Sequence, residues 1–506
     1  MMNPFIERHQ DSISGVLSCF DRVVITGTLP DICHAGAMGG YLGYLKIRLF
    51  DYPRWAEPLR EELRENAVRL AAETGLKIEF IRKLKAFRKE ARIKEILAAR
   101  GDHPGLVHIF SAMESCSSYQ PWHDKSTHRT FLKPTSGKCL HYYFYFIDEQ
   151  FGLCYVRVPT WAPFRLQVYF NGHSWLARQL LQADIPFQML DNSFVSIADP
   201  EKGQQLADEL NAQTLHQHLA AWAQRFCPVL RHFRSGYHWS FMQVEYATDV
   251  VFRSQAEFQP LYEAIVRTAV HVIKAEHVAT FLGRKLTNAY QGEVGNDFST
   301  RIQGTRIRHH MGPASIKLYD KFACIARIEC TANDVSFFKH HRYVEQRNGE
   351  HVFKLAPLRK SIYSLSDLRQ VMHAANDRYL AFMACLDNPD AGQKAIAKMA
   401  APAKARGHSF RGFNLFLDPD YQLFLTLGRG EWAISGFRAA DLRAHIDGLS
   451  PGRASYILKR LRIHGLIKKV ARTYKYYLTK LGRRVLVTAL VIREYFVQPT
   501  LVRNAL

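Results

Sequence analysis

The stretch ASYILKRLRIHGLI, residues Ala454–Ile467, does most to decide the fold, and a recognisable pattern continues on both sides of it. Ile457, Leu458 and Leu461 recur at helical spacing and can face a core, which predicts a helix with a cationic outer face. The surrounding pattern predicts a helix at Arg438–Ile446, a turn at Ser450–Gly452, a helix at Arg453–His464, a hairpin at Leu466–Leu478 and a closing helix.

This order of helix, turn, helix and hairpin predicts a basic winged helix-turn-helix domain at the C-terminus. Residues 438–484 contain thirteen Lys or Arg, and their only acids are Asp441 and Asp447. Cations at this density favour contacts with phosphates. The predicted nucleic-acid-binding residues lie on the second helix and the hairpin: Arg453, Lys459, Arg460, Arg462, Lys468, Lys469 and Lys475.

Residues 436–484 resemble the winged helix of MarR-type transcriptional repressors, with Ala454–Ile467 and the following wing as the specific part. The resemblance implies a homodimer that places two recognition helices in successive major grooves of a duplex. Repressors of this kind are usually short single-domain chains, whereas more than four hundred residues precede the matching segment here.

The composition of the whole chain points to a polyanionic partner. It has 68 Lys plus Arg and 46 Asp plus Glu, which gives a net charge of +22. We expect DNA or RNA rather than a membrane, because no basic amphipathic helix and no run of eighteen apolar residues stand out. The nine cysteines form no CxxC pair. They predict reduced thiols, a cytoplasmic location and no structural zinc site.

The length and the alternation of helical and strand patterns predict an α+β multidomain protein. Glu57–Thr74 reads as a helix, and His141–Ile147 with Leu153–Val158 reads as a β-hairpin. The predicted domains are an α/β N-terminal domain (1–110), a strand-rich α+β domain (111–235), a central α+β domain with the candidate site (236–385), a linker (386–412) and the winged helix (413–506).

The central candidate site lies in the segment Gly304–Asp334. Strands are predicted at Ile316–Tyr319 and Ile325–Glu329, around a tight turn at Phe322–Ala323. A two-residue turn would set Asp320 opposite Ile325. It would put Asp320 and Glu329 on the same face of the hairpin, about 13 Å apart.

The same hairpin resembles the "YDK … R-[IF]-E" strand pair of rolling-circle replication initiators. The matching residues are Tyr319, Asp320, Lys321, Arg327, Ile328 and Glu329. The resemblance implies that Asp320 and Glu329 help to hold a divalent Mg or Mn ion, and that a tyrosine attacks phosphorus. The chain departs from that family because it has no His-hydrophobic-His motif.

Further candidates lie on both sides of this hairpin. Glu245 and Asp249 are four residues apart on a predicted strand, so that both carboxylates lie on one face. Additional nucleic-acid-binding candidates are cations of the same region: Arg284, Lys285, Arg306, Arg308 and Lys317. An ordinary polar sheet face also accounts for such residues.

Three functions stay open at this point. The first is a nucleic-acid-binding protein of a mobile or replicating element that nicks a strand with a metal ion. The second is a winged-helix transcriptional regulator without enzymatic activity, and the third is an RNA-binding scaffold. No Walker-type loop, GxSxG or HExxH sequence supports other hydrolytic chemistry.

Overall fold

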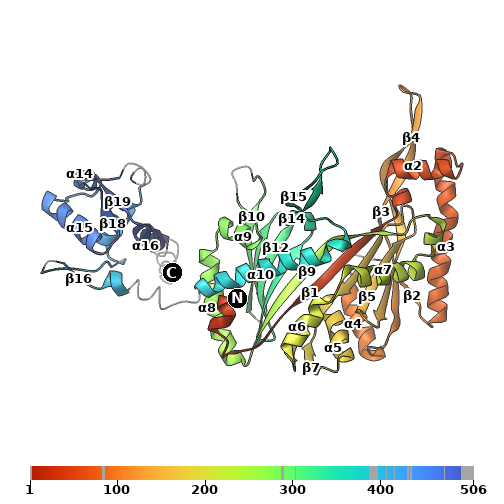
Figure 1. Ribbon diagram of the computed structural model, residues 1–506, viewed down its shortest axis with the longest axis horizontal. Coiled ribbons are helices and arrows are strands. Elements are labelled where there is room, and N and C mark those ends of the chain that lie inside the picture. Colours follow the sequence, from red (N-terminus) through yellow and green to blue (C-terminus); the bar gives the residue numbers. More distant parts are fainter. Residues whose placement is uncertain are drawn as a thin grey trace. The chain divides into compact units, whose positions relative to one another are not determined.

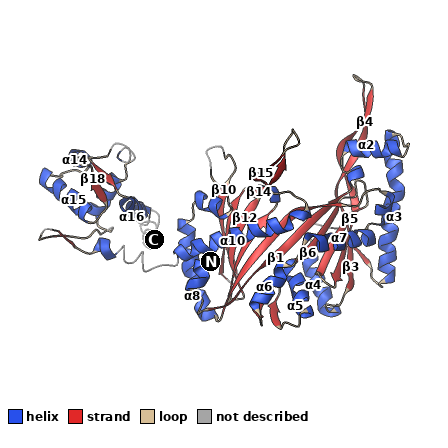
Figure 2. Cartoon of the chain, viewed as in Figure 1, coloured by secondary structure: helices blue, strands red, loops and turns tan. Residues whose placement is uncertain are grey.

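The chain is a mixed α+β protein, described here by a computed structural model (Figures 1 and 2). The structure describes residues 3–82, 86–286, 290–301, 304–386, 397–405, 407–414, 416–429, 432, 436–471 and 473–491. Two compact units divide the chain, Met1–Asp387 and Asn388–Leu506. Each unit is considered by itself.

An 11-stranded sheet forms the framework of the first unit, in the order β10-β11-β12-β13-β9-β1-β6-β5-β4-β3-β2. Its strands are β1 (Ile13–Thr28), β2 (Ile78–Phe80), β3 (Gly105–Asp124), β4 (Arg129–Asp148), β5 (Gly152–Pro159), β6 (Leu166–Asn171), β9 (His238–Phe252), β10 (Val294–Arg301), β11 (Gly304–Met311), β12 (Ala314–Lys321) and β13 (Ile325–Ala332). All neighbours pair antiparallel except β2 and β3.

Helices and two small hairpins surround this sheet. The helices are α1 (Pro4–Arg8), α2 (Ala35–Tyr44), α3 (Tyr52–Glu73), α4 (Lys89–Arg100), α5 (Gly172–Gln182), α6 (Pro200–Asp208), α7 (Ala212–Phe226), α8 (Gln255–Val272), α9 (Ala275–Phe281) and α10 (Leu365–Leu386). The hairpins are β7 (Phe187–Leu190) with β8 (Ser193–Ile197), and β14 (Lys339–Glu345) with β15 (His351–Pro357).

The central strands are buried on both faces. Helix α10 crosses one face, where Asn376 donates to the carbonyls of Tyr246 and Ile328. Helix α5 and hairpin β7–β8 supply residues to the other face, as the contacts of Arg327 with His173 and Ser193 demonstrate. A charged side chain on either face is therefore desolvated and needs a partner.

The N-terminal unit forms one body rather than three. The boundary predicted after residue 110 falls inside β3, and the sheet joins strands from all three predicted segments. The main hydrophobic core extends from Phe5 to Ala384, and a smaller cluster lies around Phe110 and Tyr145. Because sheet pairing is non-local, the composition shifts along the chain marked changes of local structure, not domain boundaries.

The second unit contains short strands and helices: β16 (Ala403–Ala405), β17 (His408–Phe410), α12 (Asp418–Leu427), α14 (Ala439–His445), α15 (Pro451–Ile463), β18 (Ile467–Lys469), β19 (Tyr476–Leu478) and α16 (Lys480–Val491). It has its own core, which includes Leu442, Leu458 and Leu461. Residues 387–396 of the predicted linker lie outside the described residues.

Several local predictions are confirmed. The helix predicted at Glu57–Thr74 is α3, and the hairpin predicted at His141–Val158 is β4–β5. The helices and the hairpin predicted within residues 438–478 are α14, α15 and β18–β19. Among the described residues, none of the helices is both long and apolar enough to cross a membrane. The cysteines whose side chains are described are free thiols.

Candidate functional site

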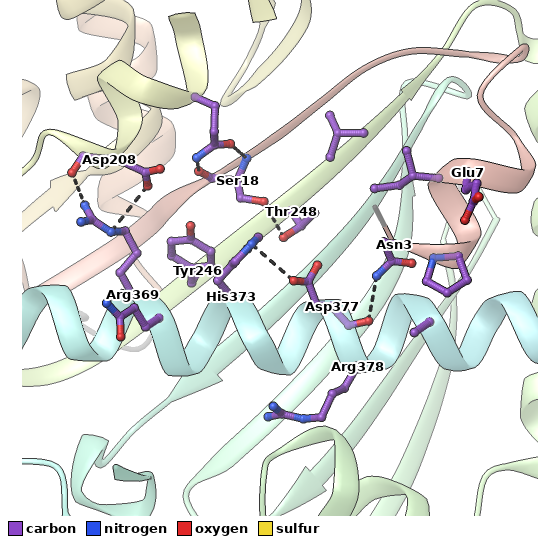
Figure 3. A pocket seen from close by; sticks show the side chains of 16 residues that line it. Asn3, Glu7, Ser18, Asp208, Tyr246, Thr248, Arg369, His373, Asp377 and Arg378 are labelled. Carbon is purple, nitrogen blue, oxygen red and sulfur yellow. Dashed lines mark hydrogen bonds and ion pairs between the residues drawn. The ribbon is translucent and has the colours of Figure 1, made fainter. Parts of the chain in front are cut away.

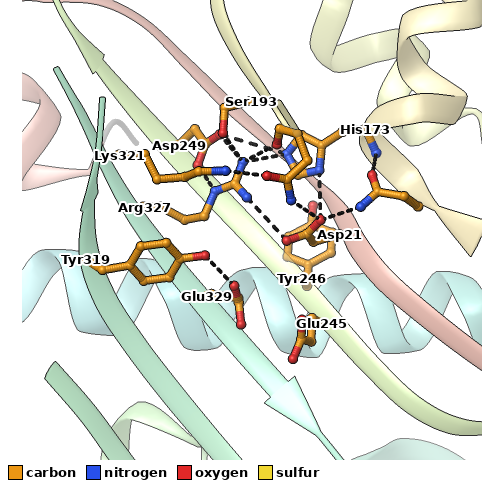
Figure 4. A network of polar contacts seen from close by, with 12 residues as sticks. Asp21, His173, Ser193, Glu245, Tyr246, Asp249, Tyr319, Lys321, Arg327 and Glu329 are labelled. Carbon is orange, nitrogen blue, oxygen red and sulfur yellow. Dashed lines mark hydrogen bonds and ion pairs between the residues drawn. The ribbon is translucent and has the colours of Figure 1, made fainter. Parts of the chain in front are cut away.

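Arg327 on β13 is the centre of a buried polar network (Figure 4). Its side chain has no solvent exposure. The guanidinium donates to both carboxylate oxygens of Asp249, each at 2.6 Å, and to Asp21 at 3.2 Å. It also donates to Ser193 Oγ and to the carbonyl of Asn192. A buried guanidinium with two carboxylates is stable only because its donors are satisfied in this way.

The charges of these two carboxylates depend on Arg327 and His173 together. Burial raises the pKa of Asp249, but Arg327 and His173 outweigh it and bring that pKa to about 2. Burial likewise raises the pKa of Asp21, and the interactions with His173 and Arg327 outweigh it, so that the pKa lies well below its usual range. Both carboxylates are therefore ionised at neutral pH.

Strand alternation positions Asp21. Leu17 of β1 is opposite Asp249, so Asp21, four residues on, lies on the same face as Arg327. Asp21 lies at a β-bulge, where the pairing with β9 shifts between Phe20 and Val23. Asn171 and Asn192 donate to Asp21 Oδ1 at 2.7 and 2.8 Å. Helix α5 begins close by. Any Cβ on Gly172 would lie 2.1 Å from the Phe20 carbonyl oxygen, so only glycine permits this approach.

Three carboxylates meet beside this network. Asp21 of β1, Glu245 of β9 and Glu329 of β13 each offer an oxygen, and these oxygens lie within 4.8 Å of one another. The three strands are adjacent in the sheet. Asp21 and Glu329 are buried, whereas the side chain of Glu245 keeps 16% of its exposure and opens the cluster to solvent.

Lys317 and Tyr319 of β12 complete the cluster. Lys317 Nζ contacts Glu329 and lies 3.4 Å from Glu245, and the Tyr319 hydroxyl donates to Glu329 at 2.7 Å. Burial lowers the pKa of Lys317, but the carboxylates of Glu329 and Glu245 outweigh it and raise that pKa. Burial and the Glu329 carboxylate raise the pKa of Glu245. The cluster therefore attracts a cation and disfavours further negative charge.

A row of charges crosses the sheet toward the carboxylates. Arg308 of β11 is opposite Lys317 of β12, which is opposite Glu329 of β13, so the three side chains share one face. Arg306 shares this face with Arg308 by the alternation of β11. Arg308 is two strands from Glu329, or about 10 Å. This face thus combines a carboxylate cluster with neighbouring cations.

The chemistry available at the cluster is that of a hard divalent cation. Carboxylate oxygens are the ligands that Mg and Mn prefer, and three of them converge here. Lys317 already contributes one positive charge to the same oxygens. A divalent ion would compete with the Lys317 ammonium for Glu245 and Glu329.

The structure brings together only some of the predicted site residues. Glu245, Glu329 and Tyr319 lie in the cluster, and Lys317, predicted to bind nucleic acid, contacts it. Asp249 does not contribute there, because both of its oxygens bind Arg327.

Asp320 lies on the opposite face of the sheet from Glu329, which corrects their assignment as joint metal ligands. The reason is the register of the hairpin. Lys321 pairs with Ile325 across three residues, two of which, Phe322 and Ala323, have positive φ. Asp320 therefore pairs with Ala326, one position from the expected Ile325. A slip of one residue moves a side chain to the other face.

Asp21 was not predicted from the sequence. It is separated from Glu245 and Glu329 by most of the unit, and no short motif connects them. One signal was available. Asp21 and Arg22 interrupt the apolar run from Leu17 to Ile25, and a charged residue in a strand buried on both faces needs a specific partner.

The opposite face of the sheet contains a cavity of 920 Å³ (Figure 3). Its polar groups pair with one another. Ser18 Oγ lies 2.9 Å from Thr248 Oγ1, and His373 lies 3.4 Å from Asp377. Arg369 binds the Asp208 carbonyl. These groups do not converge on one point, so the carboxylate cluster is the stronger candidate site.

The predicted cations of the second unit mostly face solvent. Arg453, Lys459 and Arg462 of α15 are exposed, as are Lys468 and Lys469, and Lys475 is half-buried. A cavity of 580 Å³ is lined by Lys459, Arg462, Lys469 and Tyr474 among others. This surface joins the outer side of α15 to hairpin β18–β19.

Arg460 is the exception, and its assignment to nucleic-acid binding is wrong. It is buried and donates to both oxygens of Asp420, at 2.7 and 2.9 Å. It also donates to the carbonyls of Arg411 and Gly412. The sequence placed four cations on one helix, and one of them turns inward because a buried acid is available.

The cations predicted near the central hairpin have different surroundings. Arg284 donates to the Phe337 carbonyl at 3.2 Å and lies over the Phe337 ring, whereas Lys285 is exposed. Arg306 and Arg308 are half-buried, and Arg308 lies 3.8 Å from Asp297.

Comparison with protein-family models, with curated proteins and with solved structures finds no match for this chain.

Proposed function

We propose that the protein binds nucleic acid and hydrolyses a phosphodiester bond with a divalent cation held by Asp21, Glu245 and Glu329. The observation that carries the proposal is the convergence of these carboxylates beside a row of cations on one sheet face. Mg or Mn suits the oxygen ligands. Such an ion polarises the phosphoryl group and activates water.

The residues around the carboxylates have separate proposed roles in binding the substrate and positioning the site. Arg308 and Arg306 are suited to contact the phosphates that flank the scissile bond. Lys317 would leave the carboxylates when the cation binds, and would then be free to contact the substrate. Arg327 does not meet the substrate. It is a positioning residue that fixes Asp21 and Asp249.

Water is the proposed nucleophile. Burial and the Glu329 carboxylate raise the pKa of Tyr319 well above its usual range, which disfavours the phenolate that attack would require. The water oxygen forms a bond to phosphorus, its proton passes to a carboxylate, and the phosphorus–oxygen ester bond breaks. The leaving oxygen takes up a proton. The products are one phosphate-terminated end and one hydroxyl-terminated end.

The second unit is the proposed docking element. Helices α14 and α15 with hairpin β18–β19 follow one another in the order of a winged helix-turn-helix. Lys459, Arg462 and Lys469 line its open surface, which fits the phosphate backbone of a duplex.

The test uses the full chain with labelled single- and double-stranded oligonucleotides, in EDTA or with Mg or Mn. The wild type should cut only with the cation. Glu245→Gln and Glu329→Gln should each reduce the rate roughly a hundredfold or more, because a neutral amide holds the ion more weakly and does not accept a proton. Tyr319→Phe should keep most of the activity, and no protein–DNA adduct should form.

Cleavage that persists in EDTA, or that survives both glutamine variants, would contradict the proposed centre. A covalent adduct that is lost in Tyr319→Phe would restore tyrosine as the nucleophile. A wild type that cuts nothing but binds a palindromic duplex without metal would favour the regulator, and copurification with one defined RNA would favour the scaffold.

A further inference from the structure

Hairpin β14–β15 projects from the sheet as a ribbon of its own (Figure 1). It follows β13, the strand of Glu329, with only a turn at Val335–Phe337 between them. None of its residues was among the predicted site residues. Its composition and exposure differ from those of an ordinary edge hairpin.

One face of this ribbon carries exposed rings. Tyr343 is opposite Phe353 and His341 is opposite Leu355, so these four side chains share a face. Tyr343, Phe353 and Leu355 are 65%, 59% and 55% exposed. The Phe353 ring stacks on His341 at 5.8 Å and lies 5.2 Å from the Tyr343 ring. The result is a continuous column of rings open to solvent.

The ribbon is also strongly basic. Residues 339–360 contain six Lys or Arg and only Glu345 and Glu350 as acids. Arg342 and Lys354 are opposite each other on the second face. Among the described residues, no ion pair neutralises Lys339, Arg347, Lys354 or Arg359, whereas Lys360 lies 2.9 Å from Asp334. On the ring face itself Lys339 and Glu345 lie at the two ends of the column. The remaining cations flank it from the second face, the turn and the segment after β15.

We infer that the β14–β15 ribbon binds single-stranded nucleic acid, with unpaired bases stacked on Tyr343 and Phe353 and phosphates on the flanking cations. The inference rests on the proposed function and adds its substrate class. Rings that face solvent can stack only on bases whose faces are free. Base faces inside a duplex are covered by their neighbours, so the ribbon selects an unpaired strand.

The location of the ribbon supports this partner over an anionic membrane or a second copy of the chain. It belongs to the same unit as the carboxylate cluster and the Arg308–Lys317 row. A strand held on the ribbon would be retained by the unit that is proposed to cut it. The net charge of the ribbon also disfavours its own self-association.

The test measures binding of the full chain to mixed-sequence single-stranded DNA, single-stranded RNA and duplex DNA by fluorescence anisotropy, in EDTA at fixed salt. The combined change Tyr343→Leu and Phe353→Leu keeps apolar bulk but removes both rings. It should weaken single-strand binding roughly tenfold to a hundredfold. It should leave duplex binding by the second unit within about twofold.

Two control variants isolate the rings. The combined change Tyr343→Phe and Phe353→Tyr keeps stacking and should bind like the wild type. The combined change Val344→Ala and Val352→Ala alters the opposite face of the same ribbon and should also bind normally. Unfolding midpoints of all variants show whether a loss of binding reflects a loss of fold.

Equal single-strand affinity of the leucine variant and the wild type would overturn the inference and leave the proposed cleavage centre intact. A wild type that binds no nucleic acid at all would overturn both. Binding of the ribbon to anionic phospholipid vesicles without oligonucleotide binding, or a dimer that dissociates in the leucine variant without loss of single-strand affinity, would assign the rings to those partners instead. A difference between the DNA and RNA affinities would identify the strand it prefers.

Discussion

Arg327 is the residue on which the centre of the sheet depends most. Its guanidinium offsets two buried carboxylates, Asp249 and Asp21. We expect Arg327→Met to lower the free energy of unfolding by about 3–5 kcal/mol, because it leaves two buried carboxylates that share only His173 as a charged partner. Urea denaturation at pH 7 would measure this. Arg327→Lys keeps the positive charge but loses the two-pronged contact with Asp249. Its free energy of unfolding should therefore lie between those of the wild type and Arg327→Met. A wild-type midpoint in the methionine variant would contradict the role of Arg327.

Ionisation of Asp320 should change the free energy of unfolding in the opposite direction from ionisation of Asp249. Burial raises the pKa of Asp320 from 3.8 to about 6, so its ionisation opposes folding. This loss of stability is absent below about pH 4, grows between about pH 4 and 6, and stays constant above about pH 6. Asp320→Asn should therefore be more stable than the wild type at pH 8, by at most about 2 kcal/mol, and equal to it at pH 4.

Asp249→Asn is the matched control for this titration. The pKa of Asp249 is lowered to about 2, so its ionised form stabilises the fold above pH 4 and that contribution is lost as the pH falls toward 2. The asparagine variant should be less stable than the wild type at pH 8, with a gap that narrows in acid. Thermal unfolding at several pH values would measure both. The same sign of change for both variants would refute this assignment.

At the scale of the element, helix α15 separates two roles that are adjacent in the sequence. Lys459 and Arg462 face solvent, whereas Arg460 binds Asp420 in the core. We expect Lys459→Ala with Arg462→Ala to weaken duplex binding and to reduce the log–log salt slope by about two, since each lost phosphate contact contributes about 0.9. The unfolding midpoint of this double variant should equal that of the wild type.

Arg460→Ala is the counterpart on the same helix. It should lower the free energy of unfolding by about 3–5 kcal/mol, because buried Asp420 loses its two-pronged partner and keeps only the Asn414 N–H and a 3.7 Å contact with Arg411. Binding by the fraction that stays folded should keep its wild-type salt slope. Binding isotherms at several salt concentrations, with a denaturation curve for each variant, distinguish the two. An unchanged slope in the Lys459 and Arg462 double variant would remove α15 from the docking surface.

The elements could be predicted from the sequence to the extent that their patterns are local. Helix α3 was predicted from a long helical pattern rich in Glu and Arg, and its buried Leu59, Leu63 and Leu70 follow helical spacing. The β12–β13 hairpin was also predicted, but a turn one residue longer than expected placed Asp320 on the wrong face. Register depends on the turn geometry, which side-chain patterns do not define.

The candidate site could be predicted only in part, for a similar reason. Glu245 and Glu329 were chosen from the patterns of their own strands. The third carboxylate, Asp21, lies on β1, which is adjacent to β9 in the sheet but more than two hundred residues away in the sequence. A sheet whose neighbours are distant in sequence brings together residues that no motif connects. The sequence did not predict that residues 1–387 form one unit, for the same reason. Strand β9 pairs with β1 on one side and with β13 on the other, although these strands are far apart in the sequence.

At the scale of the whole molecule, binding and cutting are assigned to different features, so they should separate. The chain carries a net charge of +22, and Glu245 and Glu329 place negative charge where a phosphate would approach. We expect Glu245→Gln with Glu329→Gln to abolish cleavage and, in EDTA at low salt, to bind an oligonucleotide about two- to tenfold more tightly. The gain should disappear at high salt, because screening removes the repulsion that the substitution relieves.

Glu201→Gln with Glu209→Gln makes the same change of charge at exposed positions on and beside α6. It should keep full cleavage and shift the affinity less, since salt screens a charge that is distant from the bound strand more strongly than one close to it. Anisotropy titrations at two salt concentrations, together with the cleavage assay, measure both properties in one set of proteins. If the cluster variant bound more weakly than the α6 variant, the carboxylates would be stabilising the fold around Lys317 rather than facing a phosphate, and the assignment of the cluster to the substrate would fail.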